Sequence, residues 1–480
     1  MLTATLRLGS LVLLCGALIT AQRQSGFSLR VGADAFDLIY DTYVNADVLL
    51  GFVIPDITVP FGNGKVTAKN TNIVGPFTRP SFEKEFEEGQ MSLKVGNGEI
   101  SLHGDWEAQQ SFLFITFYFS GFFDMTVRGL SVEIGLTGTG SDVPYDPSSL
   151  SCEAESNDVD VSLGGGFIAF IVNIFRGFIS GAVRDSINGQ ACSLLMSQAA
   201  SGMIGFELLG GQLVADYSLT REAAVTADSV QTFHRGEFTT PGGAATPFEP
   251  ALSCQVDESK LVNFCFSEFV FNSALFHAHE EGLIRVEAGY DDGPPLDRFL
   301  VFTCPTPPCL GYVFPTLEAV FPNGTADLQV RSQIPPRVDV DTTTFGRLVL
   351  VPSAQVAVHI IGIDESGTTR TDALDMVLNF TTSFIPMVNA THITGQVGLT
   401  ELSLDSADPL VGGPIDIDDA RSKVGMFSSL IELAINGMLE NGFPIPMLEG
   451  LFLSDPVLTG ADDDTLIINA NLEPAVEALY

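Results

Sequence analysis

Residues 419–441 read DARSKVGMFSSLIELAINGMLEN and carry a strong helical pattern. Their apolar residues return every three or four positions, which places them on one face of an α-helix. Asn441-Gly442 comes just after the last of them and is typical of a helix C-cap. The pattern predicts one long amphipathic helix whose apolar stripe consists of Val424, Phe427, Leu430, Ile431, Ala434, Ile435 and Met438.

The two halves of the chain repeat one order of elements: a helix, a group of strands and a second helix. Helical periodicity predicts the helices of the first half over 34–50 and 166–196, and the first helix of the second half over 267–281. The strand candidates are 99–106, 112–119, 125–136 and 159–163 in the first half, and 328–340, 348–363, 375–380 and 394–404 in the second. The repeated order predicts two related modules.

A linker rich in proline and glycine separates the halves: residues 239–250 read TTPGGAATPFEP. With the signal segment described next, it divides the chain into four regions. We predict a signal peptide over 1–21, a first module over 22–215, a central segment with the linker over 216–258, and a second module over 259–480.

The N-terminus has the pattern of a cleaved export signal. Arg7 is the only charge in the first 21 residues, an apolar run extends from Leu8 to Ile19, and Thr20-Ala21 offers a small-residue cleavage site. A second apolar run over 161–175 is shorter than the roughly 20 residues that a membrane span needs. We therefore expect a soluble, secreted, extracellular protein.

Cysteines and sequons agree with export. Loss of Cys15 with the signal leaves six of the seven cysteines, and an even number favours disulfides in a secreted protein, although many pairings stay open. Cys254 and Cys265, and likewise Cys304 and Cys309, are close enough in sequence for local bridges. N-glycosylation is predicted at the three Asn-x-Thr sequons, Asn323, Asn379 and Asn389.

The charge balance excludes one class of partner. The chain holds 22 Lys and Arg against 59 Asp and Glu, a formal net charge of −37. Nucleic acids and anionic membrane surfaces are polyanions that bind clustered basic residues. We therefore expect no nucleic-acid binding and repulsion from anionic lipid.

Some elements are apolar on every side. Residues 112–119, FLFITFYF, are apolar on both faces of the strand predicted there, and the helix from Gly166 is apolar around much of its circumference. Such an element must be buried on all sides, span a membrane or line an apolar cavity. Two long apolar helices laid against curved sheets predict a slot suited to acyl chains.

Catalytic and metal-binding motifs are missing from the sequence. It contains no Gly-x-Ser-x-Gly and no His-Glu-x-x-His. His277 and His279 are two apart on a predicted helix and point to different faces, so joint metal ligation is not expected. The acidic clusters at 158–160, 416–419 and 462–464 lack the ligand spacing of a calcium loop. We therefore predict no enzyme activity, no catalytic residue and no metal.

Eight short segments follow one another in a characteristic order: residues 95–106 (VGNGEISLHGDW), 129–134 (GLSVEI), 151–152 (SC), 186–192 (SINGQAC), 216–219 (DYSL), 235–238 (RGEF), 269–274 (FVFNSA) and 441–446 (NGFPIP). No one segment is specific, but their order and spacing together are. In that order they resemble the secreted family of bactericidal/permeability-increasing, lipopolysaccharide-binding and plasma lipid-transfer proteins, within the tubular lipid-binding superfamily.

The resemblance implies an α+β boomerang of two pseudo-symmetric barrels, each a twisted antiparallel sheet wrapped on a long helix, joined by a central sheet. It implies an apolar pocket in each barrel for phospholipid or another acyl lipid, with no cofactor apart from that lipid. It also implies a disulfide between a sheet cysteine and a cysteine late in the long helix, positions held here by Cys152 and Cys192. We expect a monomer that contacts membrane or lipoprotein surfaces transiently.

The predicted lipid contacts lie on the helices, where ordinary core packing is an equal alternative for each residue. For the N-terminal pocket they are Phe36, Ile39, Tyr43, Phe167, Phe170, Ile171 and Phe178. For the C-terminal pocket they are Phe276, Phe427, Leu430, Ile431, Ile435 and Met438. The predicted function is lipid binding or transfer. The alternative, host defence through bacterial lipopolysaccharide, is disfavoured because the acidic chain lacks the clustered Lys and Arg that bind lipid phosphates.

Overall fold

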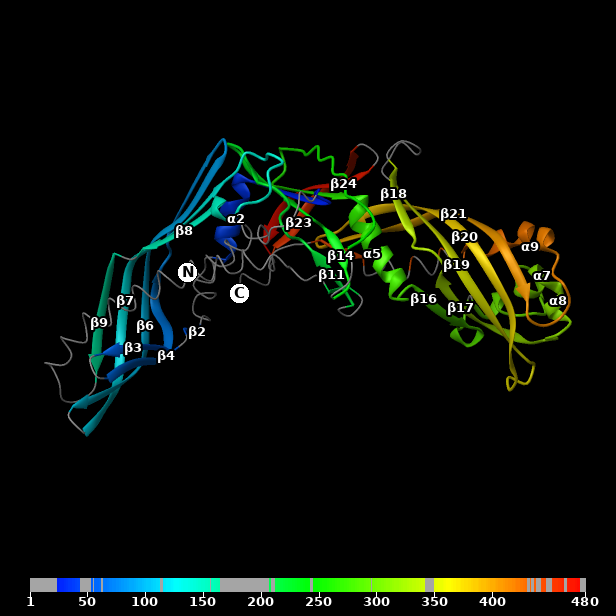
Figure 1. Ribbon diagram of the computed structural model, residues 1–480, viewed down its shortest axis with the longest axis horizontal. Helices are drawn as coiled ribbons and strands as arrows, with labels where there is room; N and C mark the ends of the chain where they lie inside the picture. Colours follow the sequence, from blue (N-terminus) through cyan, green and yellow to red (C-terminus); the bar gives the residue numbers. More distant parts are fainter. Residues whose placement is uncertain are drawn as a thin grey trace.

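A computed structural model describes residues 24–43, 53–54, 56–61, 64–112, 115–155, 157–164, 207–208, 212–241, 245–294, 296–341, 349–429, 432, 436, 442–445, 451–461 and 464–474. The molecule is long and bent, with one curled sheet toward each end and another sheet in the middle (Figure 1). This arrangement confirms the predicted α+β boomerang. The long helix expected over 166–196 lies outside the described residues.

The N-terminal sheet has the strand order β2-β4-β6-β7-β8. Its longest strands, β6 (Gln90–Phe112) and β7 (Ile115–Thr137), pair antiparallel from Gln90 opposite Thr137 to Phe112 opposite Ile115. β3 pairs with β4, β5 with β6, and β9 with β7. The other strands are β2 (Val53–Ile54), β3 (Ile57–Phe61), β4 (Gly64–Thr78), β5 (Ser81–Glu87), β8 (Leu150–Glu155) and β9 (Asp158–Gly164), and the 3-10 turn η1 (Pro147–Ser149) precedes β8.

The central sheet joins segments from both ends of the chain. Its order is β12-β13-β1-β15-β24-β23, formed by β12 (Ala224–Val225), β13 (Ser229–His234), β1 (Phe27–Gly32), β15 (Val262–Ser267), β24 (Thr465–Pro474) and β23 (Leu451–Ala461). Phe27 lies opposite His234 on one side and Phe266 on the other. A small neighbouring sheet has the order β10 (Glu207–Leu208), β11 (Leu213–Asp216) and β14 (Glu237–Thr239).

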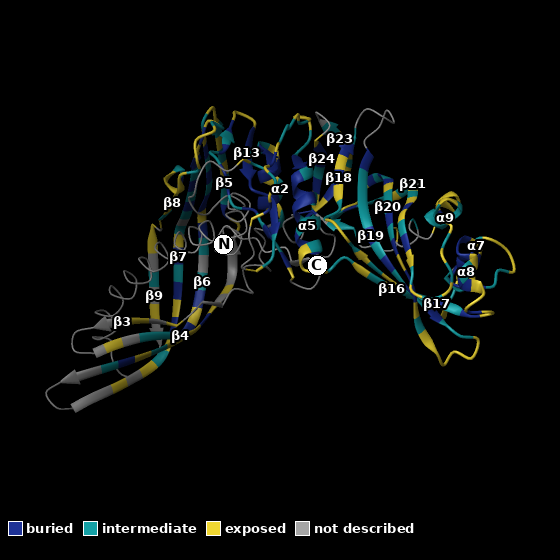
Figure 2. Cartoon of the chain, turned by 45° about the vertical axis from the view of Figure 1, so that its right-hand side comes forward, coloured by how far each residue is buried: buried dark blue, intermediate teal, exposed yellow. Residues whose placement is uncertain are grey.

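The C-terminal sheet has the order β16-β17-β19-β20-β21-β22, with β18 paired to β19. Its strands are β16 (Arg285–Gly289), β17 (Thr325–Ser332), β18 (Arg337–Asp341), β19 (Val349–Ile363), β20 (Arg370–Val388), β21 (His392–Pro409) and β22 (Phe443–Pro444). Buried residues alternate with half-buried or exposed ones along much of β19 and β20, so one face of this sheet is packed in the core and the other is more open to solvent (Figure 2).

Two predicted helices are confirmed where the structure describes them. α2 (Ala33–Tyr43) begins one residue before the helix expected over 34–50, and α5 (Glu268–Glu280) is the helix expected over 267–281, with Ser267 as its N-cap. The helix expected over 419–441 is not continuous: it begins as α9 (Ile417–Val424) and is interrupted by the 3-10 turn η3 (Gly425–Phe427). The sequence analysis missed the short elements η2 (Tyr290–Asp292), α6 (Leu296–Phe299), α7 (Leu310–Val313) and α8 (Pro315–Glu318).

Two strand predictions were wrong. The strand expected over 112–119 is instead a hairpin, because β6 ends at Phe112 and β7 begins at Ile115, its partner across the turn. The strand expected over 328–340 is two strands, β17 and β18. Pro335 and Pro336 separate them, because proline has no N–H to donate to a sheet ladder.

Two local disulfides are present. Cys254 bonds to Cys265 on β15, and Cys304 bonds to Cys309 just before α7. Cys152 on β8 is disulfide-bonded as well. Cys192 lies outside the described residues, so its pairing with Cys152 stays a prediction.

Candidate functional site

The inner face of the N-terminal sheet is apolar over much of its length. Successive side chains on a strand point to opposite faces, and the buried residues of β6 and β7 alternate with less buried ones (Figure 2). Ten of the buried residues belong to one core cluster: Met91, Leu93, Val95, Leu102, Phe123, Met125, Val127, Val132, Ile134 and Leu136. This face of the N-terminal sheet is therefore a long apolar surface.

α2 packs at one end of this surface. The side chains of Phe36 and Ile39 are 0% exposed, and the Phe36 ring centroid lies 5.6 Å from that of Phe86 on β5. One turn on, Tyr40 stacks on Phe82 at 4.8 Å. The structure therefore brings two predicted contact residues, Phe36 and Ile39, into the packed core between α2 and β5. Tyr43 ends α2, and Phe167, Phe170, Ile171 and Phe178 lie outside the described residues.

The two described C-terminal candidates lie apart. Phe276, on α5 beside the central sheet, is half-buried and meets the linker residue Phe248 edge-to-face at 5.6 Å. Phe427 follows α9 at the far end of the C-terminal sheet, where its ring lies 5.9 Å from Phe299 (Figures 1 and 2). The remaining candidates, Leu430, Ile431, Ile435 and Met438, lie outside the described residues.

An aromatic group at the junction of the central and C-terminal sheets was not predicted. The rings of Phe238 and Phe271 each lie 5.7 Å from that of Phe443, and Phe266 lies 6.5 Å from it. Phe271 and Phe443 are only half-buried, so this group offers apolar surface beside the packed core. The sequence feature that could have indicated this group is the high density of phenylalanine in residues 264–276. It was missed because each phenylalanine on its own is most simply interpreted as a core residue.

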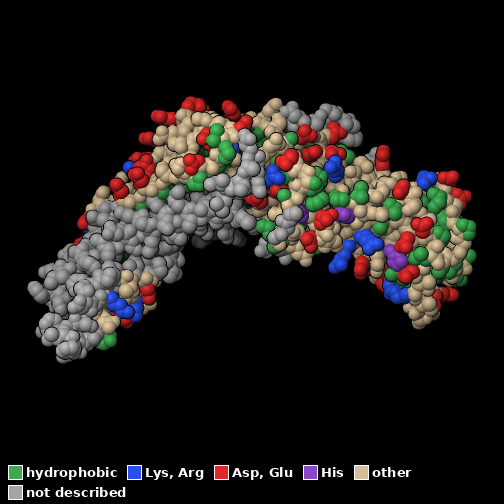
Figure 3. Space-filling model, viewed as in Figure 1, with side chains coloured by type: hydrophobic (Ala, Val, Ile, Leu, Met, Phe, Trp, Pro, Cys, Tyr) green, Lys and Arg blue, Asp and Glu red, His purple; other side chains and the backbone are tan. Residues whose placement is uncertain are grey.

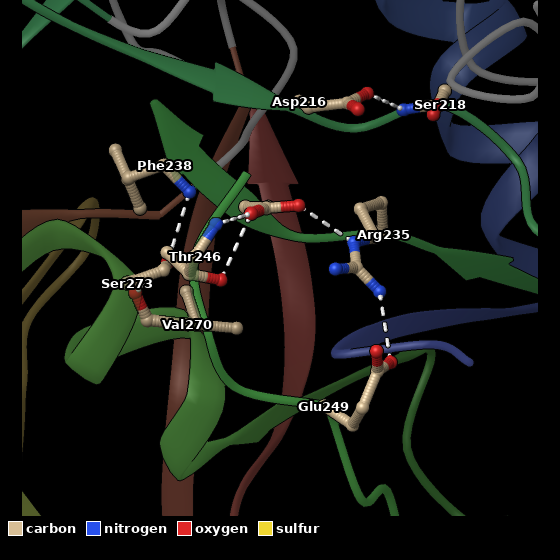
Figure 4. A network of polar contacts seen from close by, with 9 residues as sticks. Asp216, Ser218, Arg235, Phe238, Thr246, Glu249, Val270 and Ser273 are labelled. Atoms are coloured by element: carbon tan, nitrogen blue, oxygen red, sulfur yellow. Dashed lines mark hydrogen bonds and ion pairs between the residues drawn. The ribbon is translucent and has the colours of Figure 1, made fainter. Parts of the chain in front are cut away.

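A buried polar network ties the linker to this junction (Figure 4). Arg235 Nε donates to Glu237 Oε2 at 2.7 Å, and the two side chains are only 6% and 5% exposed. Glu237 Oε1 accepts from the backbone N–H of Thr246 at 2.7 Å and from its hydroxyl at 2.9 Å. The Phe238 N–H donates to the Ser273 hydroxyl at 2.9 Å, which fixes α5 against β14.

Two titratable groups of this region are held in one protonation state. Burial alone would raise the pKa of Glu237, but hydrogen bonds from Thr246 and Arg235 outweigh it, and the pKa is lowered. Burial lowers the pKa of His234 to about 4. The His234 ring bonds to the Thr232 hydroxyl through Nε2 and to the Tyr217 carbonyl through Nδ1, which donates.

Acidification should therefore remove the contribution of His234 to stability. The unfolded His234 binds a proton near pH 6.5 and the folded one only near pH 4, so this contribution is lost as the pH drops through that window. Burial raises the pKa of Glu268 to about 7, so that carboxyl acts in the opposite sense, and the His234 contribution has to be measured by difference. The full loss is about 3 kcal/mol, from 1.36 kcal/mol per pKa unit. Urea unfolding at pH 7.5, 6, 5 and 4 measures it. The difference in unfolding free energy between wild type and His234→Gln should shrink by this amount between pH 6.5 and 4, and a difference that does not change with pH would contradict the assignment.

Other sequence-predicted sites have structural roles or remain untested. The Asp416 carboxylate caps α9, accepting from the N–H groups of Asp418 and Asp419 at 3.1 Å each. Asn323 and Asn389 lie in exposed turns and Asn379 lies within β20; glycosylation at all three stays a prediction. Among the described residues, no group of three or more His, Cys, Asp or Glu side chains is placed to hold a metal ion. None of the described helices is long and apolar enough to cross a membrane.

Two curled sheets with apolar inner faces, joined by a central sheet, define a class of two-module proteins built around apolar interiors. Residues 209–473 match the sequence profile described as the LBP / BPI / CETP family, C-terminal domain. The chain belongs to this family, which comprises lipid-binding and lipid-transfer proteins.

Individual relatives are distant but similar along most of their length. The chain is 23% identical to a lipopolysaccharide-binding protein of Homo sapiens, over 88% of each chain. It is 23% identical to a bactericidal permeability-increasing protein of Sebastes schlegelii, over 86% of this chain and 88% of the relative. It is 25% identical to a phospholipid transfer protein of Mus musculus, over 56% of each. A crystal structure of lipopolysaccharide binding protein aligns over 94% of this chain and 99% of that one, with 18% identity and a TM-score of 0.37.

Proposed function

We propose that this protein is a secreted lipid carrier that holds phospholipid or another acyl lipid against the apolar inner faces of its two curled sheets, and that it has no enzyme activity. The observation that carries the proposal is the continuous apolar face of β6 and β7, which is far longer than α2 alone covers. Long apolar, concave surfaces suit acyl chains, because burial of each CH₂ contributes about 0.8 kcal/mol.

The alternative ligand is bacterial lipopolysaccharide, after which the human relative is named. Its phosphates would need unpaired basic side chains on the N-terminal module. Among the described residues of this module, five of the seven basic side chains face acids: Lys69 bonds to Glu107, Arg79 to Asp41, Lys84 to Asp34 and Asp37, Lys94 to Glu133, and Arg128 to Glu99 and Asp158. The paired basic residues favour a neutral or zwitterionic lipid.

The carrier would touch donor and acceptor membranes through apolar surface. Tyr118 and Phe122, near the hairpin end of β7 at the outer end of the N-terminal sheet, are 75% and 46% exposed (Figure 1). Exposed aromatic residues bind the membrane interface without a need for anionic lipid. We infer that docking is transient, by a monomer, on membrane or lipoprotein surfaces.

A vesicle-transfer assay tests the proposal. Exchange with phosphatidylcholine vesicles should be nearly independent of salt, whereas exchange with phosphatidylserine vesicles should accelerate as salt rises. The reason is screening of the net charge of −37, since the Debye length falls from about 10 Å at 0.1 M to about 3 Å at 1 M. Tight binding to phosphatidylserine vesicles or to lipopolysaccharide at low salt would instead support the host-defence alternative.

The exposed acidic row of β5 provides a matched variant. Glu83, Glu85 and Glu87 alternate with less exposed residues, so they share one face. Replacing all three by Gln removes three negative charges without touching the core. The variant should exchange faster than wild type with phosphatidylserine vesicles at low salt, and at the wild-type rate with phosphatidylcholine.

A further inference from the structure

A groove of about 750 Å³ lies on the polar face of the C-terminal sheet, beside the C-terminal end of α5. It crosses β16, β17, β19, β20 and β21, on the side opposite the face that buries Val358 and Met376 in the apolar core. It is therefore separate from the apolar interior proposed to hold acyl chains. Figure 3 shows Lys, Arg and His side chains gathered on the concave side of the C-terminal half.

Two arginines stand at one end of this groove. Arg285 on β16 lies directly opposite Arg331 on β17, and both are exposed. Like charges directly opposite on antiparallel strands destabilise the pair. Neither guanidinium has an ion pair or a side-chain hydrogen bond among the described residues, whereas Arg370 on the same sheet pairs with Asp327. Two adjacent unpaired arginines are an unusual feature in a chain with 59 acidic residues and 22 basic ones.

The side chains that form the floor of the groove beside the two arginines are short. Ala357 on β19 lies opposite Arg331, Val377 on β20 lies opposite Ala357, and Ser406 on β21 lies opposite Val377. These short side chains leave room above them for a ligand. The guanidinium groups can reach over this floor, where each presents a planar fork of donors that suits the oxygens of a phosphate.

The other end of the groove is acidic. Asp375 on β20 lies directly opposite Asp408 on β21, a second like-charged pair. His359 lies against this acidic end: its Nδ1 is 2.7 Å from Asp375 and its Nε2 is 3.1 Å from Asp372, and the hydrogen bond with Asp375 raises the pKa of the imidazole. Asp408 has no ion pair among the described residues. Of the other groups that line the groove, Glu287 lies two residues along β16 from Arg285, and His279 bonds to the Ser332 hydroxyl at 2.8 Å.

We propose that this groove binds a zwitterionic phosphate ester, with its phosphate on Arg285 and Arg331 and its cationic substituent toward Asp408 and Asp375. A ligand of this kind relieves both like-charge pairs at once, which neither inorganic phosphate nor a simple amine does. The same chemistry occurs in a soluble phosphocholine or phosphoethanolamine ester and in the headgroup of a phospholipid.

Calorimetric titration of the full-length protein with phosphocholine, at low salt, tests the proposal. Wild type should bind phosphocholine, and inorganic phosphate at least several-fold more weakly. R285Q and R331Q should each weaken phosphocholine binding about tenfold or more, whereas the control R370Q should bind as wild type does. The substituted side chains are exposed, so thermal unfolding without ligand should show Tm values at or above that of wild type for R285Q and R331Q.

A second arm identifies the source of the ester. Dihexanoyl phosphatidylcholine, kept below its micelle concentration, should lose affinity in R285Q and R331Q by the same factor as phosphocholine. Only the binding that R285Q and R331Q weaken counts here, because the apolar interior would also take up this lipid. If that arginine-dependent binding is tighter for the lipid than for phosphocholine, the groove is assigned to a lipid headgroup, and if it is equal, to a soluble ester. Absence of phosphocholine binding to wild type, or binding that R285Q and R331Q retain, would overturn the proposal. Neither result depends on whether the apolar interior carries lipid.

Discussion

Arg235→Ala should lower the free energy of unfolding by about 3–5 kcal/mol, the usual cost of leaving a buried charge without its partner. The substitution leaves the Glu237 carboxylate, which is 5% exposed, with only the Thr246 donors. Urea unfolding at pH 7.5, followed by circular dichroism, measures the loss.

Glu249→Ala is the matched control, because it removes the other carboxylate beside the same arginine. Glu249 Oε2 lies 3.8 Å from Arg235 Nη1, and its side chain is 79% exposed. An exposed ion pair of this kind contributes about 0–1 kcal/mol. If Arg235→Ala were no more destabilising than Glu249→Ala, the buried network of Figure 4 would not hold the linker to the central segment. The double change Arg235→Met with Glu237→Leu should cost less than Arg235→Ala alone.

Phe36→Ala should also cost about 3–5 kcal/mol, the range for truncation of a fully buried phenylalanine. Phe36 is 0% exposed and packs against Phe86, so its removal leaves a cavity between α2 and β5. The same urea experiment measures the loss. Phe452→Ala is the control of the same residue type, because Phe452 on β23 is 39% exposed and should cost much less.

The lipid content of the Phe36→Ala variant separates the two roles that the sequence left open for this residue. A core residue should lower stability and leave the amount of bound lipid per folded protein unchanged. A stable variant that carries less lipid would show that Phe36 lines the pocket.

Short-range sequence patterns, such as helix caps and prolines, indicate where helices end and where strands are interrupted. α5 lies within one residue of its predicted ends, and Gly282, with φ +65°, follows its last turn, as is typical of a helix C-terminus. The break between β17 and β18 was also readable, because Pro335 and Pro336 stand between two apolar runs. No proline, glycine or other turn residue marks the point where β6 ends and β7 begins. The sequence from Phe112 to Ile115 is an uninterrupted apolar run.

Long-range pairing could not be predicted in the same way. β1, β15 and β24 are adjacent in the central sheet although about 200 residues separate each from the next, and no local pattern encodes that register. The sequence also could not show that Phe276 and Phe427 lie far apart. Helical periodicity predicts which face of a helix is buried, but not which other element packs against that face. The groove at Arg285 and Arg331 was equally hidden, since it depends on which residues of β16 and β17 lie opposite one another.

Mass spectrometry of lipid extracted from the natively secreted, detergent-free protein tests the central claim most directly. We predict at least one phospholipid or other acyl lipid per chain, retained through gel filtration. Stable, folded protein that carries no lipid, and takes none up from phosphatidylcholine vesicles, would contradict the account of this chain as a lipid carrier.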